Sequence, residues 1–164
     1  MSGVSKAIVQ PLLSWYDAGH RDLPWRSEPA PYRVWVSEIM LQQTRVEAVR
    51  GYFSRWMNAL PDIPALAAAD EAVYTKLWEG LGYYSRVRNL HRAAVLLCEE
   101  YGGELPADYD RLLALPGVGE YTAGAVASIA FGLPVPAVDG NVLRVAARLD
   151  NDFTPITDAK FKKQ

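Results

Sequence analysis

Residues 115–119 read Leu115-Pro116-Gly117-Val118-Gly119, and this stretch decides the fold. It separates a short helix expected over about 108–114 from an alanine-rich helix expected over about 120–131. Glycine adopts positive φ freely and lets the backbone approach a ligand, so we expect both properties at Gly117 and Gly119. The N–H groups of the turn and of the next helix then face outward at the positive end of a helix dipole. The stretch predicts a hairpin between two helices that binds one phosphate, although a plain Pro-Gly connector fits the same residues.

The remainder of the chain has helical patterns. Apolar residues three and four apart, Ile8, Leu12 and Trp15, predict a first helix that ends near residue 19. Proline positions and cap residues predict further helices over 31–42, 45–60, from Asp70 to about residue 79, and over 85–101, with a last helix that starts near Asp139. Residues 134–138 are too short and too rich in proline for a paired strand. The expected fold class is all-α.

Composition limits the partners. With 164 residues, half of them hydrophobic, the chain suits one globular domain of ordinary size or two small lobes. A net charge of -2 argues against a strongly basic coat protein for nucleic acid, but leaves room for a local DNA-binding face. The single cysteine, Cys98, excludes an intrachain disulfide and is expected in the core. We see no apolar leader or membrane span, so we expect no membrane partner and a cytoplasmic, nucleoid-associated location in a bacterium or a nuclear one in a eukaryote.

Asp139 stands in the run Pro136-Ala137-Val138-Asp139-Gly140-Asn141-Val142, at the start of the last expected helix. An aspartate here is an ordinary helix N-cap. An ionised carboxylate can also stabilise the positive charge that develops on a sugar when its glycosidic bond breaks. The residue alone leaves both interpretations open.

Several further motifs occur in a fixed order, and together they cover about residues 23–148. They are Leu23-Pro24-Trp25-Arg26, Ser37-Glu38-Ile39-Met40-Leu41-Gln42-Gln43-Thr44, Gly80-Leu81-Gly82-Tyr83-Tyr84, Arg88-Asn89-Leu90 and the run from the hairpin to Val142. In this order the chain resembles MutY-type adenine DNA glycosylases, which belong to the helix-hairpin-helix base-excision glycosylases. The resemblance implies a six-helix barrel lobe over 22–135, with the helix-hairpin-helix at 108–131. It also implies an incomplete second helical lobe formed by 1–21 and 136–164.

The same resemblance implies a reaction and its residues. Adenine opposite 8-oxoguanine or guanine in double-stranded DNA is cut from its sugar, with Asp139 stabilising the oxocarbenium-like sugar. Glu38 protonates the adenine at N7, and its apolar neighbours should raise its pKa for this purpose. A surface glutamate on a helix is the alternative for Glu38. Asn141 either caps the turn or supports the site.

Tyr121 decides the branch of the family. Bifunctional relatives of the endonuclease III type have a lysine two residues after the last hairpin glycine, and its amine attacks the sugar. Here that residue is Tyr121, so we expect a monofunctional hydrolase in which Tyr121 supports the sugar by hydrogen bonding. Packing is the alternative role for this ring.

Base flipping requires further residues, which the resemblance also supplies. Gln43 and Tyr83 correspond to the wedge that fills the gap left by the flipped base. The expected adenine pocket consists of Arg21, Leu23, Trp25 and Arg26. The DNA-binding hairpin consists of Leu115, Gly117, Val118 and Gly119. The helix after Tyr84 carries a basic cluster that either contacts DNA phosphates or simply faces solvent. The cluster comprises Arg86, Arg88, His91 and Arg92.

The resemblance breaks at the C-terminal end of the sequence. Family members continue into a loop of four cysteines that binds a [4Fe-4S] cluster and into a domain that recognises 8-oxoguanine, so we expect this chain to be a fragment without metal ligands. The apolar faces around Ile8, Leu12 and Trp15 and around Leu143, Ala146 and Leu149 would then lack partners, which predicts self-association. A monovalent cation at the hairpin carbonyls is a further expectation. Two alternatives to the adenine glycosylase stay open: an endonuclease III-like glycosylase/lyase, and a noncatalytic DNA-binding module.

Overall fold

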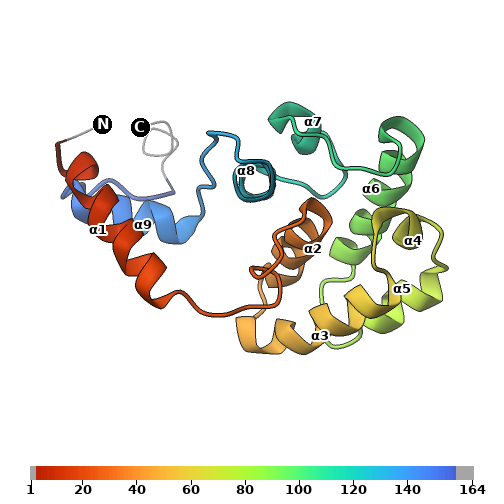
Figure 1. The fold of residues 1–164 in the computed structure, drawn as a ribbon. Coiled ribbons are helices and arrows are strands. Elements are labelled where there is room, and N and C mark those ends of the chain that lie inside the picture. Colours follow the sequence, from red (N-terminus) through yellow and green to blue (C-terminus); the bar gives the residue numbers. More distant parts are fainter. Residues whose placement is uncertain (1–2, 158–164) are drawn as a thin grey trace. The chain divides into compact units, whose positions relative to one another are not determined.

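A computed structural model describes residues 3–157, and within that range every regular element is a helix, which confirms the expected all-α class (Figure 1). In chain order the helices are α1 (Gly3–Gly19), α2 (Pro31–Leu41), α3 (Val46–Ala59), α4 (Ile63–Ala67), α5 (Glu71–Trp78), α6 (Ser85–Tyr101), α7 (Tyr109–Leu113), α8 (Glu120–Ala125), the π-helix η1 (Val126–Ala130) and α9 (Gly140–Leu149). None of the described helices is long and apolar enough to cross a membrane.

The chain divides into two compact units. One comprises Leu23–Ala137, and the other combines 1–22 with 138–164, of which 3–22 and 138–157 are described. The sequence placed these boundaries at 22 and 135. The catalytic candidates are thereby distributed: Glu38 and Tyr121 belong to the larger unit and Asp139 to the smaller one.

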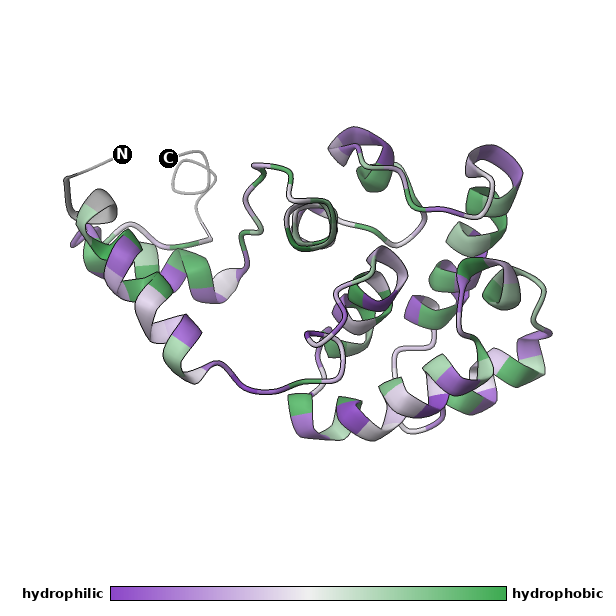
Figure 2. Ribbon diagram, in the orientation of Figure 1, coloured by the Kyte–Doolittle hydropathy of each residue, from purple (hydrophilic) through white to green (hydrophobic). Residues whose placement is uncertain are grey.

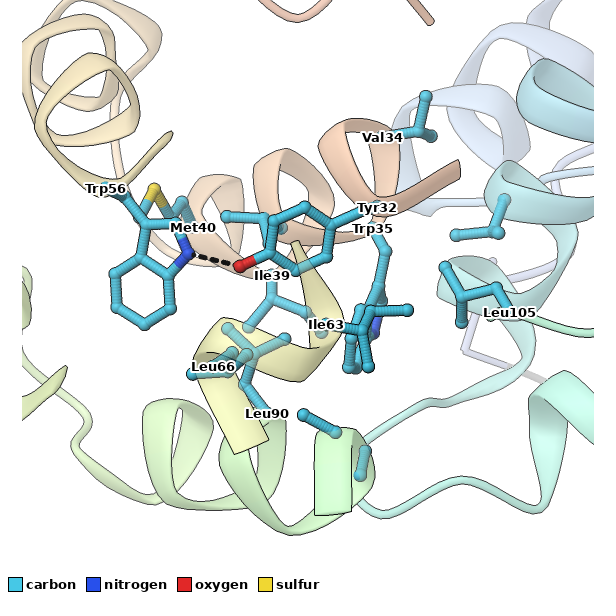
Figure 3. Packing of buried hydrophobic residues seen from close by; sticks show 14 of the residues in the cluster. Tyr32, Val34, Trp35, Ile39, Met40, Trp56, Ile63, Leu66, Leu90 and Leu105 are labelled. Atoms are coloured by element: carbon cyan, nitrogen blue, oxygen red, sulfur yellow. Dashed lines mark hydrogen bonds between the residues drawn. The ribbon is translucent and has the colours of Figure 1, made fainter. Parts of the chain in front are cut away.

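The larger unit has a core built around α2, of which the residues Tyr32, Val34, Trp35, Val36, Ile39 and Met40 are buried. Helices α3, η1 and α8 pack against α2, and α4 packs against α6. Figure 3 shows Ile63 and Leu66 of α4 and Leu90 of α6 close to the α2 residues. Cys98 contributes to this core from a half-buried position on α6. This packing fixes the end of α2, which carries Glu38 and leads into Gln43.

Tyr32 links α2 to the end of α3 through polar atoms in this core. Its hydroxyl accepts a hydrogen bond from Trp56 Nε1 at 3.0 Å (Figure 3). The same hydroxyl donates one to the Leu60 carbonyl at 2.9 Å. Burial raises the pKa of the Tyr32 phenol; the bond from Trp56 opposes this rise and the charge of Asp62 adds to it. The phenol therefore stays neutral and keeps its proton for Leu60.

Tyr32→Phe is expected to destabilise the larger unit. It removes one oxygen and leaves two buried groups, Trp56 Nε1 and the Leu60 carbonyl, without a partner, which costs about 1–3 kcal/mol. Thermal unfolding followed by circular dichroism measures the loss. Tyr52→Phe is the matched control, because the Tyr52 hydroxyl also donates to a backbone carbonyl, that of Glu79, but in an exposed place. Equal stability losses in the two variants would contradict the prediction.

Most helix ends agree with the sequence. Pro31 occupies the first turn of α2, and Gly102 ends α6 in the left-handed conformation at φ 64°. Asp70 precedes α5 as expected, but its side chain caps nothing, whereas Asp62 caps α4 by accepting a hydrogen bond from Ala65 N–H. The five-residue α4 itself had no counterpart in the sequence predictions.

The helix expected over 120–131 changes its winding. After α8 the chain continues as the π-helix η1, which packs against α2. The Ser128 hydroxyl donates to the Gly124 carbonyl at 2.7 Å, the acceptor that an α-helix would give to the N–H of residue 128. Competition by the Ser128 hydroxyl for this carbonyl is consistent with the wider turn of a π-helix. The spacing of apolar residues in the sequence gives no sign of this change in winding.

The smaller unit exposes apolar side chains. Along α1, Leu12 and Trp15 are exposed, and α9 has no buried residue; Ile8, Leu143 and Ala146 are half-buried. Figure 2 shows hydrophobic and hydrophilic residues along both helices. Self-association through these faces stays a prediction. Analytical centrifugation tests it, and a clean monomer with one cooperative melting transition would rule it out.

Candidate functional site

Asp139 is the N-cap of α9, and its backbone is extended at φ -103° and ψ 178°. Its Oδ1 accepts hydrogen bonds from Asn141 N–H at 2.9 Å and from Val142 N–H at 2.8 Å. Its Oδ2 accepts a third from Asn141 Nδ2 at 2.7 Å. An ionised carboxylate can accept about four hydrogen bonds, so this one is held firmly and keeps one acceptor position open.

The charge on Asp139 is favoured by its surroundings. Partial burial alone would raise the pKa of its carboxyl, but the hydrogen bonds from Val142 and Asn141 and the positive charge of Arg144 outweigh it and lower the pKa. Arg144 Nη2 donates to Asn141 Oδ1 at 2.6 Å, which orients the Asn141 amide toward Asp139. Asn141 therefore supports the carboxylate, and Asp139 itself caps the helix.

Glu38 lies on α2 between two buried residues, Ser37 and Ile39, and is itself half-buried. The next buried residue along the helix is Met40. The side chain of Glu38 thus leaves the helix at the edge of the apolar core. Its protonation state stays a prediction.

The hairpin joins α7 to α8 through residues 114–119. Leu115 and Val118 are buried and anchor the turn, while Gly117 and Gly119 are exposed. Gly117 has φ 77°, and a Cβ there would lie 2.6 Å from Asn89 Cβ. Gly119 has φ -98°, so the positive φ expected there is wrong. It serves as the N-cap of α8, and a Cβ there would meet nothing within 4 Å.

Gly117→Ala and Gly119→Ala should therefore differ in their effects on stability. Alanine at Gly117 meets both the left-handed backbone and Asn89, and costs at least about 1–2 kcal/mol. Alanine at Gly119 loses only a cap preference, about 1 kcal/mol or less, and leaves the turn in place. Urea denaturation of the two variants measures the difference. An equal loss of stability in both would show that Asn89 and the backbone angle do not constrain the turn.

Gln43 and Tyr83, the predicted wedge residues, share an unusual backbone. Gln43 has φ 59° and Tyr83 has φ 47°, and Asn151 is the only other non-glycine residue with positive φ among those described. Both side chains are exposed, Tyr83 with 66% of its surface accessible. Such conformations cost about 1–3 kcal/mol each and persist where the surrounding structure enforces them.

The predicted adenine pocket separates into buried and exposed residues. Leu23 and Trp25 are buried, and the Trp25 ring packs edge-on against Phe53 with ring centroids 5.4 Å apart. Arg21 and Arg26 are exposed, and Arg21 belongs to the smaller unit. Tyr121, in the first turn of α8, has 36% of its surface exposed.

The basic cluster on α6 mainly contacts the protein itself. Arg88 Nε lies 3.1 Å from Glu71 Oε1, and His91 stacks on Tyr74 with ring centroids 4.6 Å apart. Arg86 hydrogen-bonds to backbone carbonyls. Arg92, on the same helix, is exposed.

The family model of the HhH-GPD superfamily of base excision DNA repair proteins matches residues 36–163. The chain belongs to this superfamily. A mouse relative named adenine DNA glycosylase is 52% identical over 147 residues, which cover 84% of this chain and 28% of the mouse protein. A relative of the same name from Mycolicibacterium smegmatis is 48% identical over 138 residues, covering 84% of this chain and 47% of its own. A non-covalent endonuclease III-DNA complex has a TM-score of 0.81 and 26% identity, covering 99% of this chain and 75% of that one.

Within this superfamily the chain resembles adenine DNA glycosylases, as its motifs predict. It spans less than half the length of either relative. A four-thiolate iron-sulfur cluster does not fit the residues present, because the sequence has one cysteine. The described residues also contain no group of three or more His, Cys, Asp or Glu side chains that could hold a metal ion.

The sequence indicated neither Arg144 nor Thr122 as residues that shape the site, and it did not indicate the role that Arg86 has in the structure. Arg144 orients Asn141, and Thr122 accepts a hydrogen bond from Gln42 Nε2 at 3.4 Å. Arg86 was a candidate for phosphate contact and is instead bound to carbonyls. The i to i+3 spacing of Asn141 and Arg144 on a helix is a signal that could have found the first. Gln42 and Thr122 are 80 residues apart, which no local pattern reveals.

Proposed function

We propose that this chain forms the catalytic segment of a monofunctional adenine DNA glycosylase acting on adenine opposite 8-oxoguanine or guanine. The observation that carries the proposal is Asp139, an aspartate kept ionised by three hydrogen bonds at a helix start in a base-excision family chain. The names of the mouse and mycobacterial relatives support adenine as the base.

The chemistry divides between two carboxylates. As the bond between C1′ and N9 breaks, its electron pair moves to the adenine and positive charge develops on the sugar. Asp139 stabilises that charge as an anion. Glu38 donates its proton to adenine N7, so that neutral adenine leaves, and then takes a proton from the water that adds to C1′. The two residues belong to different compact units, and their joint action is inferred from this chemistry.

DNA contact is assigned to the larger unit. The hairpin presents its backbone N–H groups at exposed Gly117 and Gly119, and open space in front of Gly119 suits a phosphate. Gly119→Ala should therefore weaken duplex binding. Gln43 and Tyr83 enter the gap left by the flipped adenine. A monovalent cation at the turn carbonyls is part of the proposal; replacing potassium by lithium in the binding buffer tests it.

Tyr121 favours hydrolysis over the lyase reaction of the second candidate, an endonuclease III-like enzyme, to which the fold similarity also applies. A phenol at this position cannot form a Schiff base with the sugar. Its hydroxyl can support the cationic intermediate by hydrogen bonding.

A cleavage assay tests the proposal. The full-length gene product is incubated with a duplex that holds adenine opposite 8-oxoguanine, and half of each sample is then treated with hot alkali. Strand cleavage only after alkali supports a monofunctional glycosylase. Cleavage without alkali supports the bifunctional enzyme. No cleavage in either sample, with duplex binding retained, would leave a noncatalytic DNA-binding module.

A further inference from the structure

Arg86 joins two segments that are distant in the sequence. Its guanidinium donates hydrogen bonds to five backbone carbonyls. Nη1 reaches the carbonyls of Ile39 at 2.8 Å, Met40 at 3.2 Å and Gln42; Nη2 reaches those of Leu81 at 3.0 Å and Gly82 at 3.3 Å. The carbonyls of Ile39, Met40 and Gln42 lie at the C-terminal end of α2, where a positive charge also complements the helix dipole.

Two of these carbonyls belong to the residues immediately before the wedge residues. Gln42 precedes Gln43, and Gly82 precedes Tyr83, so Arg86 binds the peptide group on the N-terminal side of each. Both wedge residues have positive φ. One guanidinium therefore fixes the orientation of the peptide planes that lead into both unfavourable conformations.

Other contacts restrain Arg86 and the same two segments. The guanidinium lies over the Trp78 ring, 5.2 Å from its centroid, and 5.7 Å from the centroid of the Tyr83 ring. Trp78 Nε1 donates to the Gly82 carbonyl at 3.0 Å. The Gln42 side chain reaches Thr122 in α8, which connects the first segment to the hairpin. A flat fork between rings and carbonyls is a setting that arginine fits and lysine does not.

We propose that Arg86 is a positioning residue that presets Gln43 and Tyr83 for insertion into DNA. This inference rests on the proposed function. The preset backbone removes the cost of ordering the two wedges when the duplex binds. Arg86 acts through these residues and not through phosphate, because both terminal nitrogens already serve backbone carbonyls.

The test compares Arg86→Lys with Arg88→Lys in the full-length gene product. Arg88 is the control because it is two residues away on the same helix and pairs with exposed Glu71. Base extrusion is read from the fluorescence of 2-aminopurine placed beside a 2′-fluorinated adenosine, which resists cleavage. Adenine release is read by single-turnover kinetics on the normal substrate. Affinity for a fully paired duplex and thermal unfolding are measured in parallel.

Arg86→Lys should lower the single-turnover rate by about 10²-fold, the order of loss expected from a small misplacement of positioning groups. The fluorescence rise should disappear with it. The affinity of Arg86→Lys for a fully paired duplex should stay within about twofold of the wild-type affinity, because independent sites usually change each other's energetics by no more than this. Arg88→Lys should match the wild type in every assay. An unchanged rate and fluorescence rise in Arg86→Lys would overturn the inference.

A double-mutant cycle separates positioning from general structural support. In a background with Gln43→Ala and Tyr83→Ala, Arg86→Lys should cause no further loss of extrusion, since nothing remains to be positioned. A further loss equal to that in the wild type would overturn the inference. If the wild-type protein extrudes adenine but does not release it, the proposed function fails. The double-mutant cycle, which is read by base extrusion, still tests the role of Arg86 in that case.

Gln43→Gly provides a measurement that does not depend on the folding of the Arg86 variant. Glycine adopts the observed φ without strain, so the melting temperature of the Gln43→Gly variant should equal or exceed that of the wild type. A clear fall in melting temperature would show that the backbone at Gln43 is not held against its own preference, which contradicts the positioning role of Arg86.

Discussion

Asp139→Asn is expected to lower the single-turnover rate of adenine release by about 10²–10³-fold, the range for removal of one preorganised charge-stabilising group. Asparagine caps helices about as well as aspartate, and its Oδ1 can still accept the N–H groups of Asn141 and Val142; only the bond from Asn141 Nδ2 is lost, because an amide nitrogen cannot accept it. The fold and duplex affinity should therefore persist while the negative charge beside the sugar is lost. Rapid-quench kinetics at saturating enzyme measures the effect.

Asp152→Asn is the matched control for that substitution. Asp152 also accepts a backbone N–H, that of Thr154 at 2.8 Å, and the bonds from Thr154 also lower the pKa of its carboxyl. It has no place in the proposed chemistry. Near-normal adenine release by Asp139→Asn, or an equal loss in Asp152→Asn, would refute the assignment of Asp139.

The lowered pKa of Asp139 gives the same residue a signature in stability. A carboxyl whose pKa is lower in the folded chain than in the unfolded chain stabilises the fold when the pH is above its pKa in the unfolded chain. This contribution disappears as the pH falls through its pKa in the folded chain. The window therefore lies at and below the ordinary pKa of 3.8. Wild type should lose stability there relative to Asp139→Asn, because the amide does not titrate.

Local chemistry made much of the fold predictable. Helix α6 ends at Tyr101, as the sequence predicts, because Gly102 supplies the left-handed terminus. The turn at 115–119 is equally local, since the φ of 77° at position 117 favours glycine there. Such features depend on a few neighbouring residues, and the sequence contains all of them.

Features that depend on contacts between residues far apart in the chain could not be predicted from the sequence. Arg86 looks like one of several exposed cations on a helix, yet its partners at Ile39 and Gln42 are 47 and 44 residues away. Trp25 looks like a pocket residue through its motif, while its burial against Phe53 follows from the packing of the larger unit. The site residues could be named from motifs, but the contacts that hold them could not.

The two carboxylates also differ in how far their roles could be foreseen. Asp139 is both the ordinary N-cap and the expected charge stabiliser, because the hydrogen bonds that cap the helix are those that keep the group ionised. In the proposed mechanism, the capping role and the charge-stabilising role of Asp139 therefore do not conflict. Glu38 has the opposite requirement, since a general acid must hold its proton until the base leaves.

Glu38→Gln is expected to reduce adenine release by about 10²–10⁴-fold, the usual contribution of general acid-base catalysis. Glutamine has nearly the same shape and fits the half-buried position beside Ser37 and Ile39, so the fold of α2 should not change. It cannot deliver a proton to N7. Single-turnover kinetics measures the loss, and Glu47→Gln on α3 is the control because Glu47 is exposed and its ion pair with Arg50 lies within α3.

A modified substrate shows whether the Glu38 effect is proton transfer. In 7-deazaadenine a carbon replaces N7, so wild-type protein should bind the duplex and extrude the base but release it poorly. On this substrate Glu38→Gln should cause little additional loss, because the acceptor of the proton is already missing. If Glu38→Gln lowered release as strongly on 7-deazaadenine as on adenine, Glu38 would act by some means other than protonating N7. The superfamily membership and the role of Asp139 would stand in that case, and the acid would have to be sought among other residues.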